Sequence, residues 1–234
     1  MRLLERPSPN HDERPAAAAV DMLVLHYTGM ASCEAALERL CDPTARVSAH
    51  YLIDEGGACY RLVAEGRRAW HAGISSWRGE SDINDRSVGI ELANPGHEFG
   101  YRPFPELQMA CLTELAVDIT ARLAIPAARV VGHADVAPTR RADPGELFDW
   151  RRLALAGVGL WPPDTPPSRW DGDIEGLQHK LGALGYAVGA PGIFDAATRA
   201  AVIAFQRHYV RTRVDGEVDA RTFARLEALL ASIP

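Results

Sequence analysis

The residues best suited to chemistry are a histidine and an aspartate ten positions apart, His133 and Asp143. His133 ends an apolar run at residues 130–132 that is typical of a buried strand, and Asp143 lies on a loop directly before Pro144. A histidine and a carboxylate are suitable ligands for a catalytic zinc ion, which takes three protein ligands and keeps one position for water. Because such a pair also arises by chance, the chain must supply a third ligand, a proton carrier and a substrate surface.

His26 is the candidate for the third ligand. It ends the continuous apolar run of residues 22–26, which predicts a strand buried on both faces. A histidine at that position is either a core residue with a satisfied hydrogen bond or a ligand at the exit of a central strand, where open α/β sheets place their ligands. The segment alone favours neither interpretation. His50, in a second predicted strand at residues 47–53, is as well explained by packing behind the site as by a direct role.

Glu91 is the candidate proton carrier. In the predicted strand at residues 87–92 the apolar residues share one face, and Glu91 points the other way. Its neighbours on that side, Gly89 and Ala93, are too small to fill the space around it. The near-continuous apolar run favours a central strand, so we expect the carboxylate to point into a cavity.

A loop rich in arginine and tryptophan follows the third predicted strand. Residues 67–79 are poor material for a core, and they suit the wall of a groove that stacks sugars and pairs with carboxylates. A solvated loop with its aromatic side chains tucked beneath it is the alternative. The candidates for contact with substrate are Arg68, Trp70 and His71.

Composition limits the function classes. The chain has 234 residues, 47% hydrophobic and 24% charged, as in ordinary globular proteins, and its net charge of −6 argues against nucleic acid as a partner. The four cysteines lack any CxxC spacing, which favours a reducing compartment. The sequence contains neither a convincing signal peptide nor an apolar run of the roughly 18 residues that a membrane span needs. We therefore expect a cytoplasmic protein, with a periplasmic or cell-wall location as the alternative.

The order of the predicted elements indicates two domains. Strands and helices alternate up to about residue 160, which predicts a mixed α/β sheet flanked by helices, and one long helix begins at Pro105. Four prolines then fall between residues 161 and 170, which predicts a stiff, extended spacer.

The C-terminal part contains an internal repeat. Residues 192–198 and 216–222 match at Gly, Asp, Ala and Thr, and in each the aspartate is suited to cap the next helix. Helices are predicted at residues 174–184, 196–209 and 220–230, which make a small all-α three-helix domain. Its two histidines, His179 and His208, lie on separate helices and are predicted to be surface residues.

Five segments in this order resemble the zinc-dependent N-acetylmuramoyl-L-alanine amidases of the type 2 family, relatives of the peptidoglycan recognition proteins. These segments are residues 25–28, 48–53, 69–73, 84–92 and 133–145. The C-terminal helices resemble the three-helix peptidoglycan-binding domain. The resemblance implies a zinc amidase domain over residues 1–160, a proline-rich linker over 161–171 and a peptidoglycan-binding domain over 172–234.

The resemblance also implies roles for single residues. It implies one Zn²⁺ per chain, held by His26, His133 and Asp143, with Glu91 as the catalytic carboxylate. Arg141 stands where amidases of this kind commonly carry a lysine that stabilises the oxyanion, and an arginine is not an equivalent replacement because its charged group is planar and extended.

The implied reaction is hydrolysis of the amide between the lactyl group of N-acetylmuramic acid and L-alanine. The substrate is either polymeric peptidoglycan, as the binding domain suggests, or a soluble anhydromuropeptide, as the missing export signal suggests. A non-catalytic peptidoglycan receptor is the alternative function, but such relatives typically lack part of the ligand set. The sequence has no HExxH motif, which argues against a zinc peptidase of another family.

Overall fold

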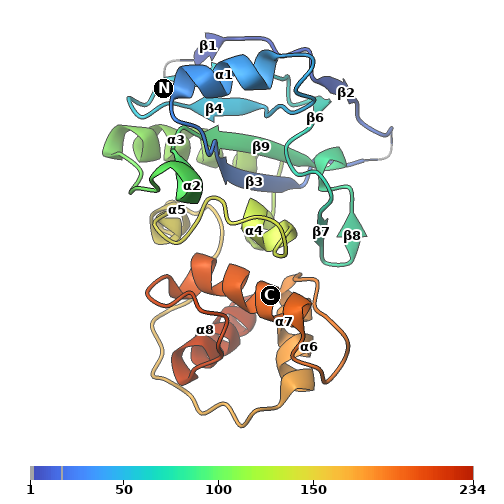
Figure 1. Cartoon of the computed structure of the whole chain (residues 1–234), viewed down its shortest axis with the longest axis vertical. Coiled ribbons are helices and arrows are strands. Elements are labelled where there is room, and N and C mark those ends of the chain that lie inside the picture. The colour runs from blue at the N-terminus through green and yellow to red at the C-terminus, as the bar shows by residue number, and fades with distance from the viewer. Residues whose placement is uncertain (1–2, 17, 234) are drawn as a thin grey trace.

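A six-stranded mixed sheet forms the centre of the larger part of the molecule (Figure 1). The structure is a computed structural model and describes residues 3–16 and 18–233. The strand order is β1-β5-β4-β9-β3-β10, and all neighbouring pairs are parallel except β4 and β5. The bounds are β1 Leu3–Glu5, β3 Met22–Tyr27, β4 Tyr51–Ile53, β5 Cys59–Arg61, β9 Ser87–Leu92 and β10 Val130–Gly132. The predicted mixed sheet flanked by helices is confirmed.

The two longest strands, β3 and β9, lie next to each other in the middle of the sheet. Their register pairs His26 with Glu91, and because side chains alternate along a strand, both point to the same face. Both residues also lie near the carboxyl ends of parallel strands, the edge at which open α/β sheets bind ligands. The sheet therefore brings these two candidates together.

One face of the sheet is covered by α3 (Glu106–Arg122) and α5 (Trp150–Leu155), which bury it in an apolar core. Pro105 stands at the N-cap of α3, in agreement with the predicted start of the long helix. The buried stripe of α3 includes Met109, Leu112, Leu115 and Ile119.

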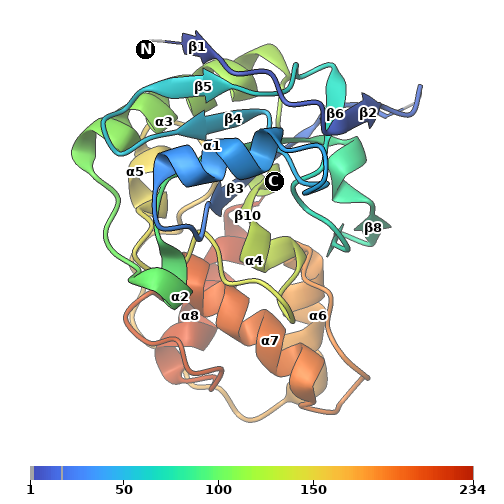
Figure 2. The same cartoon turned by 45° about the horizontal axis from the view of Figure 1, so that its top comes forward.

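The opposite face is covered at one side by α1 (Cys33–Cys41) and at the other by α4 (His133–Val136) together with the C-terminal helices. α1, capped by the Ser32 side chain, packs beside β4. The short helix α4 and the C-terminal helices cover the β3 and β10 side (Figure 2). The functional side chains lie between these two covers.

Two short antiparallel strand pairs and three further turns of helix complete the described part of the larger domain. Their bounds are β2 His11–Glu13 with β6 Arg67–Ala69, β7 Ser76–Trp77 with β8 Glu80–Ser81, η1 Ile83–Asp85, α2 Gly96–Phe99 and η2 Ala127–Arg129.

The strand predicted at residues 47–53 is shorter than expected, because β4 begins at Tyr51. His50 explains the difference: its Nδ1 accepts the Gly89 backbone N–H at 2.9 Å, so a side chain takes the place of a ladder carbonyl. The other ring nitrogen lies 3.1 Å from the Arg67 carbonyl. His50 is therefore a packed group that joins β4 to β9.

The C-terminal part contains α6 (Ile174–Leu184), α7 (Ala196–Phe205) and α8 (Ala220–Ala231). Each is capped by the side chain of the preceding aspartate. The caps of α7 and α8, Asp195 and Asp219, are the ones that the repeat predicts. The helix predicted at residues 196–209 is α7 followed by a π-helical turn, η3 (Gln206–Val210).

Residues 161–171 contain neither a helix nor a strand, and the two parts of the chain that they join are in contact. Trp161 packs against the cores on both sides of it, and Arg225 of α8 lies 5.3 Å from the Trp161 ring and donates to the Pro162 carbonyl at 2.9 Å. The C-terminal helices share one continuous core with α4 and with Met22 and Val24 of β3. Proline stiffness did not produce separation because the apolar faces on both sides pack together.

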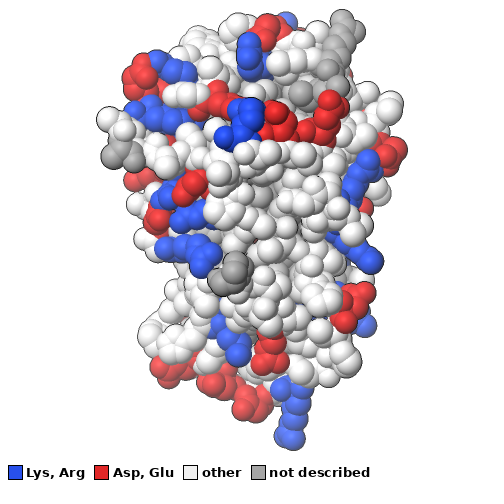
Figure 3. All heavy atoms as spheres, turned by 180° about the vertical axis from the view of Figure 1, so that it is seen from behind, with Lys and Arg blue, Asp and Glu red and all other residues white. Residues whose placement is uncertain are grey.

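On the face seen in Figure 3, acidic and basic side chains both occur near the top, along the sides and at the lower end, around a broad central area of uncharged residues. Among the described residues, no helix is both long and apolar enough to cross a membrane.

Candidate active site

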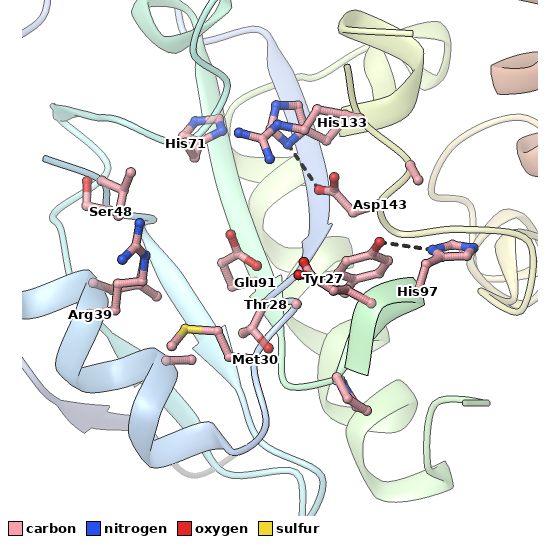
Figure 4. A pocket seen from close by; sticks show the side chains of 18 of the residues that line it. Tyr27, Thr28, Met30, Arg39, Ser48, His71, Glu91, His97, His133 and Asp143 are labelled. Atoms are coloured by element: carbon pink, nitrogen blue, oxygen red, sulfur yellow. Dashed lines mark hydrogen bonds and ion pairs between the residues drawn. The ribbon is translucent and has the colours of Figure 1, made fainter. Parts of the chain in front are cut away.

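Two histidines and an aspartate from three different elements meet at one point. His26 comes from β3, His133 from the start of α4, and Asp143 from the loop that follows α4. The Nδ1 atoms of the two histidines and Oδ2 of Asp143 lie 3.0 Å from one another. Figure 4 shows the His133 and Asp143 side chains of this group and the contact between them. All three side chains are buried, and each can offer one ligand atom to a metal ion.

Hydrogen bonds fix the tautomers of both histidines. The Ser87 hydroxyl donates to the Ile83 carbonyl at 2.6 Å, so its oxygen accepts from Nε2 of His71 at 3.2 Å. Nδ1 of His71 must then accept from Nε2 of His26, 3.0 Å away, which leaves Nδ1 of His26 without a proton. His133 reaches the same state, because its Nε2 donates to the Ala72 carbonyl at 3.0 Å. Partners of this kind orient metal-binding histidines and set their protonation.

The charges at this point suit a divalent cation. Burial lowers the pKa of His26 to about 4, and burial also lowers the pKa of His71 well below its usual value, so both rings are neutral. Burial alone would raise the pKa of Asp143, but His133 and His26 outweigh it and hold that pKa well below its usual range. Two imidazole nitrogens and one carboxylate oxygen are the donor set of a catalytic zinc site, and their mutual separations of 3.0 Å place all three within reach of one ion.

Glu91 lines the same pocket, beside His26 across the sheet. Its Oε2 is shielded from solvent and makes no hydrogen bond within the described chain. Burial, together with the negative charge of Asp143, raises the pKa of Glu91 to about 8, whereas the positive charge of Arg141 opposes the rise. An unpartnered carboxyl group with a pKa near neutrality is suited to accept and return a proton.

The His71 ring fills the space above Gly89, a contact that the sequence analysis did not predict. A Cβ atom at Gly89 would lie 2.4 Å from Cγ of His71, so the missing side chain makes room for the imidazole. His71 therefore lies behind His26, as the partner that orients it, and it also reaches the pocket wall. Sequence reasoning placed it only on the substrate side.

The pocket around these residues has a volume of about 390 Å³. Trp70, His71 and Arg141 line it, in agreement with the predicted positions of these side chains. Arg68 lies outside: its guanidinium pairs with Asp85 and with Asp12 of β2. The structure thus does not bring Arg68 to the pocket.

Three pocket residues were missed by the sequence reasoning. Arg39 of α1 lines one side, and Tyr27 lines the other, where its hydroxyl lies 2.9 Å from Nδ1 of His97. His97 in turn lies 3.2 Å from the Glu146 carboxylate. A signal was available for His97, because the short helix α2 that carries it follows β9 closely, at the ligand-binding edge of the sheet.

Comparison with known proteins gives two domain matches. Residues 16–146 match the family profile described as N-acetylmuramoyl-L-alanine amidase, and residues 171–226 match the profile of a peptidoglycan binding domain. The N-acetylmuramoyl-L-alanine amidase AmiD of Escherichia coli is 38% identical, over 97% of this chain and 90% of its own length. The 1,6-anhydro-N-acetylmuramyl-L-alanine amidase AmpD of Haemophilus influenzae is 35% identical, over 62% of this chain and 86% of its own length.

Two solved structures resemble the whole chain. The structure of E. coli AmiD with anhydro-N-acetylmuramic acid-L-Ala-D-gamma-Glu-L-Lys has a TM-score of 0.81 at 38% identity and covers 94% of this chain and 92% of that one. The structure of AmpDh3 from Pseudomonas aeruginosa in complex with anhydromuramic pentapeptide has a TM-score of 0.83 at 33% identity and covers 94% of both chains.

Proposed function

The chain belongs to the N-acetylmuramoyl-L-alanine amidase family, and on this premise we propose how its own residues perform the reaction. The enzyme hydrolyses the amide that joins the lactyl group of N-acetylmuramic acid to L-alanine in muropeptides. Water adds across this bond, so the products are a lactyl carboxylic acid and a peptide with a free amine at L-alanine.

The metal is zinc, held by His26, His133 and Asp143. Support comes from the donor set: two Nδ1 atoms that carry no proton and one carboxylate oxygen, mutually 3.0 Å apart in a buried position. Zinc bound there would supply a Lewis acid and lower the pKa of a water molecule to roughly 7.

Glu91 moves the proton. It takes a proton from the attacking water and returns it to the nitrogen of the leaving amine. Its unpartnered Oε2 and its position beside His26 support this role. Arg141 lines the pocket two residues before Asp143, where its positive charge can stabilise the oxygen that becomes negative in the transition state.

One observation carries this function: the convergence of His26, His133 and Asp143 beside an unpartnered Glu91. The test is incubation of the purified full chain with a 1,6-anhydromuramyl peptide, followed by mass spectrometry of the products. We expect release of the intact stem peptide, loss of activity with a chelator and recovery with Zn²⁺.

Two variants make this test specific. Asp143→Ala should bind zinc far more weakly than the wild type, whereas Glu91→Gln should retain zinc and lose roughly 10²-fold or more in kcat. A pure receptor would release no peptide in any of these samples. The complete set of ligands argues against that alternative.

The C-terminal module (residues 172–234) supplies binding to the polymeric wall. Support comes from its match to a peptidoglycan binding domain and from a groove of about 400 Å³ along α6, lined by residues that include Glu175, His179 and Val188. Ala183→Glu would place a bulky charge in this groove. It should weaken sedimentation with insoluble peptidoglycan while leaving hydrolysis of a soluble muropeptide unchanged. Unchanged sedimentation would assign wall binding to another surface.

The location of the enzyme is proposed to be cytoplasmic, where it would act on recycled muropeptides. Action on the polymeric wall, which the binding module implies, belongs to the alternative, a periplasmic or cell-wall location. The four cysteines are free in the structure, which suits a reducing compartment. Cell fractionation with an antibody against the native protein tests this, and recovery with the envelope fraction would contradict it.

A further inference from the structure

Asp135 is a buried charged residue that the reaction does not use. It lies in α4, two positions after His133, and only 2% of its surface is exposed. Burial of a carboxylate is costly unless hydrogen bonds compensate it. The hydrogen-bond partners of Asp135 therefore explain how a carboxylate can be buried at this position.

Three donors surround the carboxylate. The Gly132 backbone N–H donates to Oδ2 at 2.7 Å, the Tyr186 hydroxyl donates to Oδ1 at 2.6 Å, and Nδ1 of His208 donates to Oδ2 at 2.8 Å. Tyr186 and His208 both come from the C-terminal module, and each is 3% exposed. The earlier prediction that His208 is a surface residue is wrong, because the module is folded against α4.

The His208 ring is held in one orientation. It stacks between Trp150 of α5 and Tyr209, with ring centroids 3.7 Å and 3.8 Å away. The π-helical turn η3 contains His208, and such turns inside helices often mark functional positions. Nδ1 is therefore aimed at Asp135 by packing on both faces of the ring.

Asp135 connects this contact to the metal ligands. It holds the backbone N–H of Gly132, the residue directly before His133. On the other side of His133, the Ala134 backbone N–H donates to the Asp143 carbonyl at 2.8 Å. The space is tight, since a Cβ atom at Gly132 would lie 2.7 Å from Cδ of Pro144. A shift of Asp135 would thus move His133 and Asp143 relative to His26.

We propose that Tyr186 and His208 are positioning residues for the metal centre, acting through Asp135. Through this contact the C-terminal module holds two of the three ligands at binding distance, a role separate from wall binding. The inference rests on the proposed zinc site.

The experiment uses the full chain and measures zinc affinity by competition with a chromophoric chelator. Tyr186→Phe removes one hydroxyl and keeps the ring, and His208→Leu removes the other donor. His208→Asn retains a donor near the position of Nδ1 although it loses the stacked ring. Tyr209→Phe is the matched control, because it removes a neighbouring hydroxyl that makes no hydrogen bond to Asp135. Leu229→Ala controls for stability, since it removes a buried side chain from the module core and leaves both donors to Asp135 in place.

We expect Tyr186→Phe and His208→Leu to bind zinc roughly tenfold more weakly or worse. Their cobalt-substituted forms should have altered visible spectra, and kcat on a soluble muropeptide should fall with little change in KM. His208→Asn should recover most of the affinity, while Tyr209→Phe and Leu229→Ala should bind zinc like the wild type even if Leu229→Ala melts earlier.

Two results would overturn the inference. Wild-type zinc affinity and cobalt spectrum in both Tyr186→Phe and His208→Leu would show that the contact only joins the domains. A wild-type protein that fails to take up zinc would overturn the proposed metal site, and this inference with it.

Discussion

At the scale of single residues, Arg141 is a pocket side chain that its protein neighbours do not hold in place. It is exposed at the pocket wall, and among the described residues no hydrogen bond or ion pair holds its guanidinium. Its neighbour Arg140 differs, because it is tied to the carbonyls of Ala72 and Ile74. Arg141 is therefore free to interact with substrate, and Arg140 belongs to the framework.

We predict that Arg141→Ala lowers kcat by about 10²–10³-fold with little change in KM, because a charge that stabilises only the transition state is lost. Steady-state kinetics on a soluble muropeptide measure this. Arg141→Lys keeps the charge and should retain much more activity than Arg141→Ala. A raised KM at unchanged kcat would mean that Arg141 only holds substrate.

Glu91 gives a prediction about pH. In the metal-free protein its pKa is raised from 4.5 to about 8, so between these values the folded state retains a proton that the unfolded state releases. Stability from this group is therefore present at low pH and is lost as the pH rises towards 8. Glu91→Gln removes this dependence.

We predict that chelator-treated Glu91→Gln gains thermal stability relative to the wild type as the pH increases from 5 to 8. Melting temperatures of both proteins across this range measure the difference, in which the contributions of other groups largely cancel. A difference that stays constant with pH would mean that Glu91 ionises normally. Added zinc should reduce the difference, because a nearby cation favours the charged carboxylate.

At the scale of elements, strand β9 needs a residue without a side chain at Gly89, because the His71 ring packs against it. Gly89→Ala would place a methyl group against the His71 ring, so either β9 or His71 must shift. We predict a loss of about 1–3 kcal/mol in the free energy of unfolding and weaker zinc binding, since His71 orients His26. Urea unfolding and chelator competition measure the two effects.

Gly66→Ala is the matched control for this prediction. An added Cβ there meets nothing within 4 Å, so stability and zinc binding should stay as in the wild type. Equal effects of both substitutions would remove the special role of Gly89.

The elements that the sequence predicted well are those with strong local patterns. The apolar runs of β3 and β9 and the alternation of strands and helices were sufficient for the mixed sheet, and the strand ends indicated His26, Glu91 and His133 as candidates. His71 was placed on the substrate side, because its contact with Gly89 joins the segment after β6 to the middle of β9, which is distant in the sequence. The Asp135–His208 contact spans 73 positions, and no local pattern encodes such a pairing.

At the scale of the whole molecule, the shared core changes what removal of the module should do. A chain that ends at Trp161 would expose Trp77, Val136 and Ala137, which are buried with the C-terminal helices in the full chain. We predict that this truncated protein aggregates or melts well below the full chain and loses activity even on a soluble muropeptide. Light scattering, thermal melting and kinetics measure this.

A truncated protein with the melting temperature and kcat of the full chain would contradict both this prediction and the role of the interface. The comparison is informative because the match to H. influenzae AmpD covers only 62% of this chain but 86% of AmpD, so the similarity to that amidase does not extend over the whole of this chain. The dependence on the module is thus expected for this chain and not for every relative.

The continuous core between the two parts has a consequence for how the enzyme would sample a solid substrate. When a flexible linker joins a binding module to a catalytic domain, the catalytic domain can act anywhere within the length of the linker from the bound module. Here the groove of the C-terminal module and the active-site pocket are fixed to one frame, so anchoring on the wall leaves the pocket at one offset and one angle. Successive cuts in an ordered wall should then recur at a regular spacing. That spacing would depend on the fixed distance between groove and pocket and on the repeat of the wall polymer.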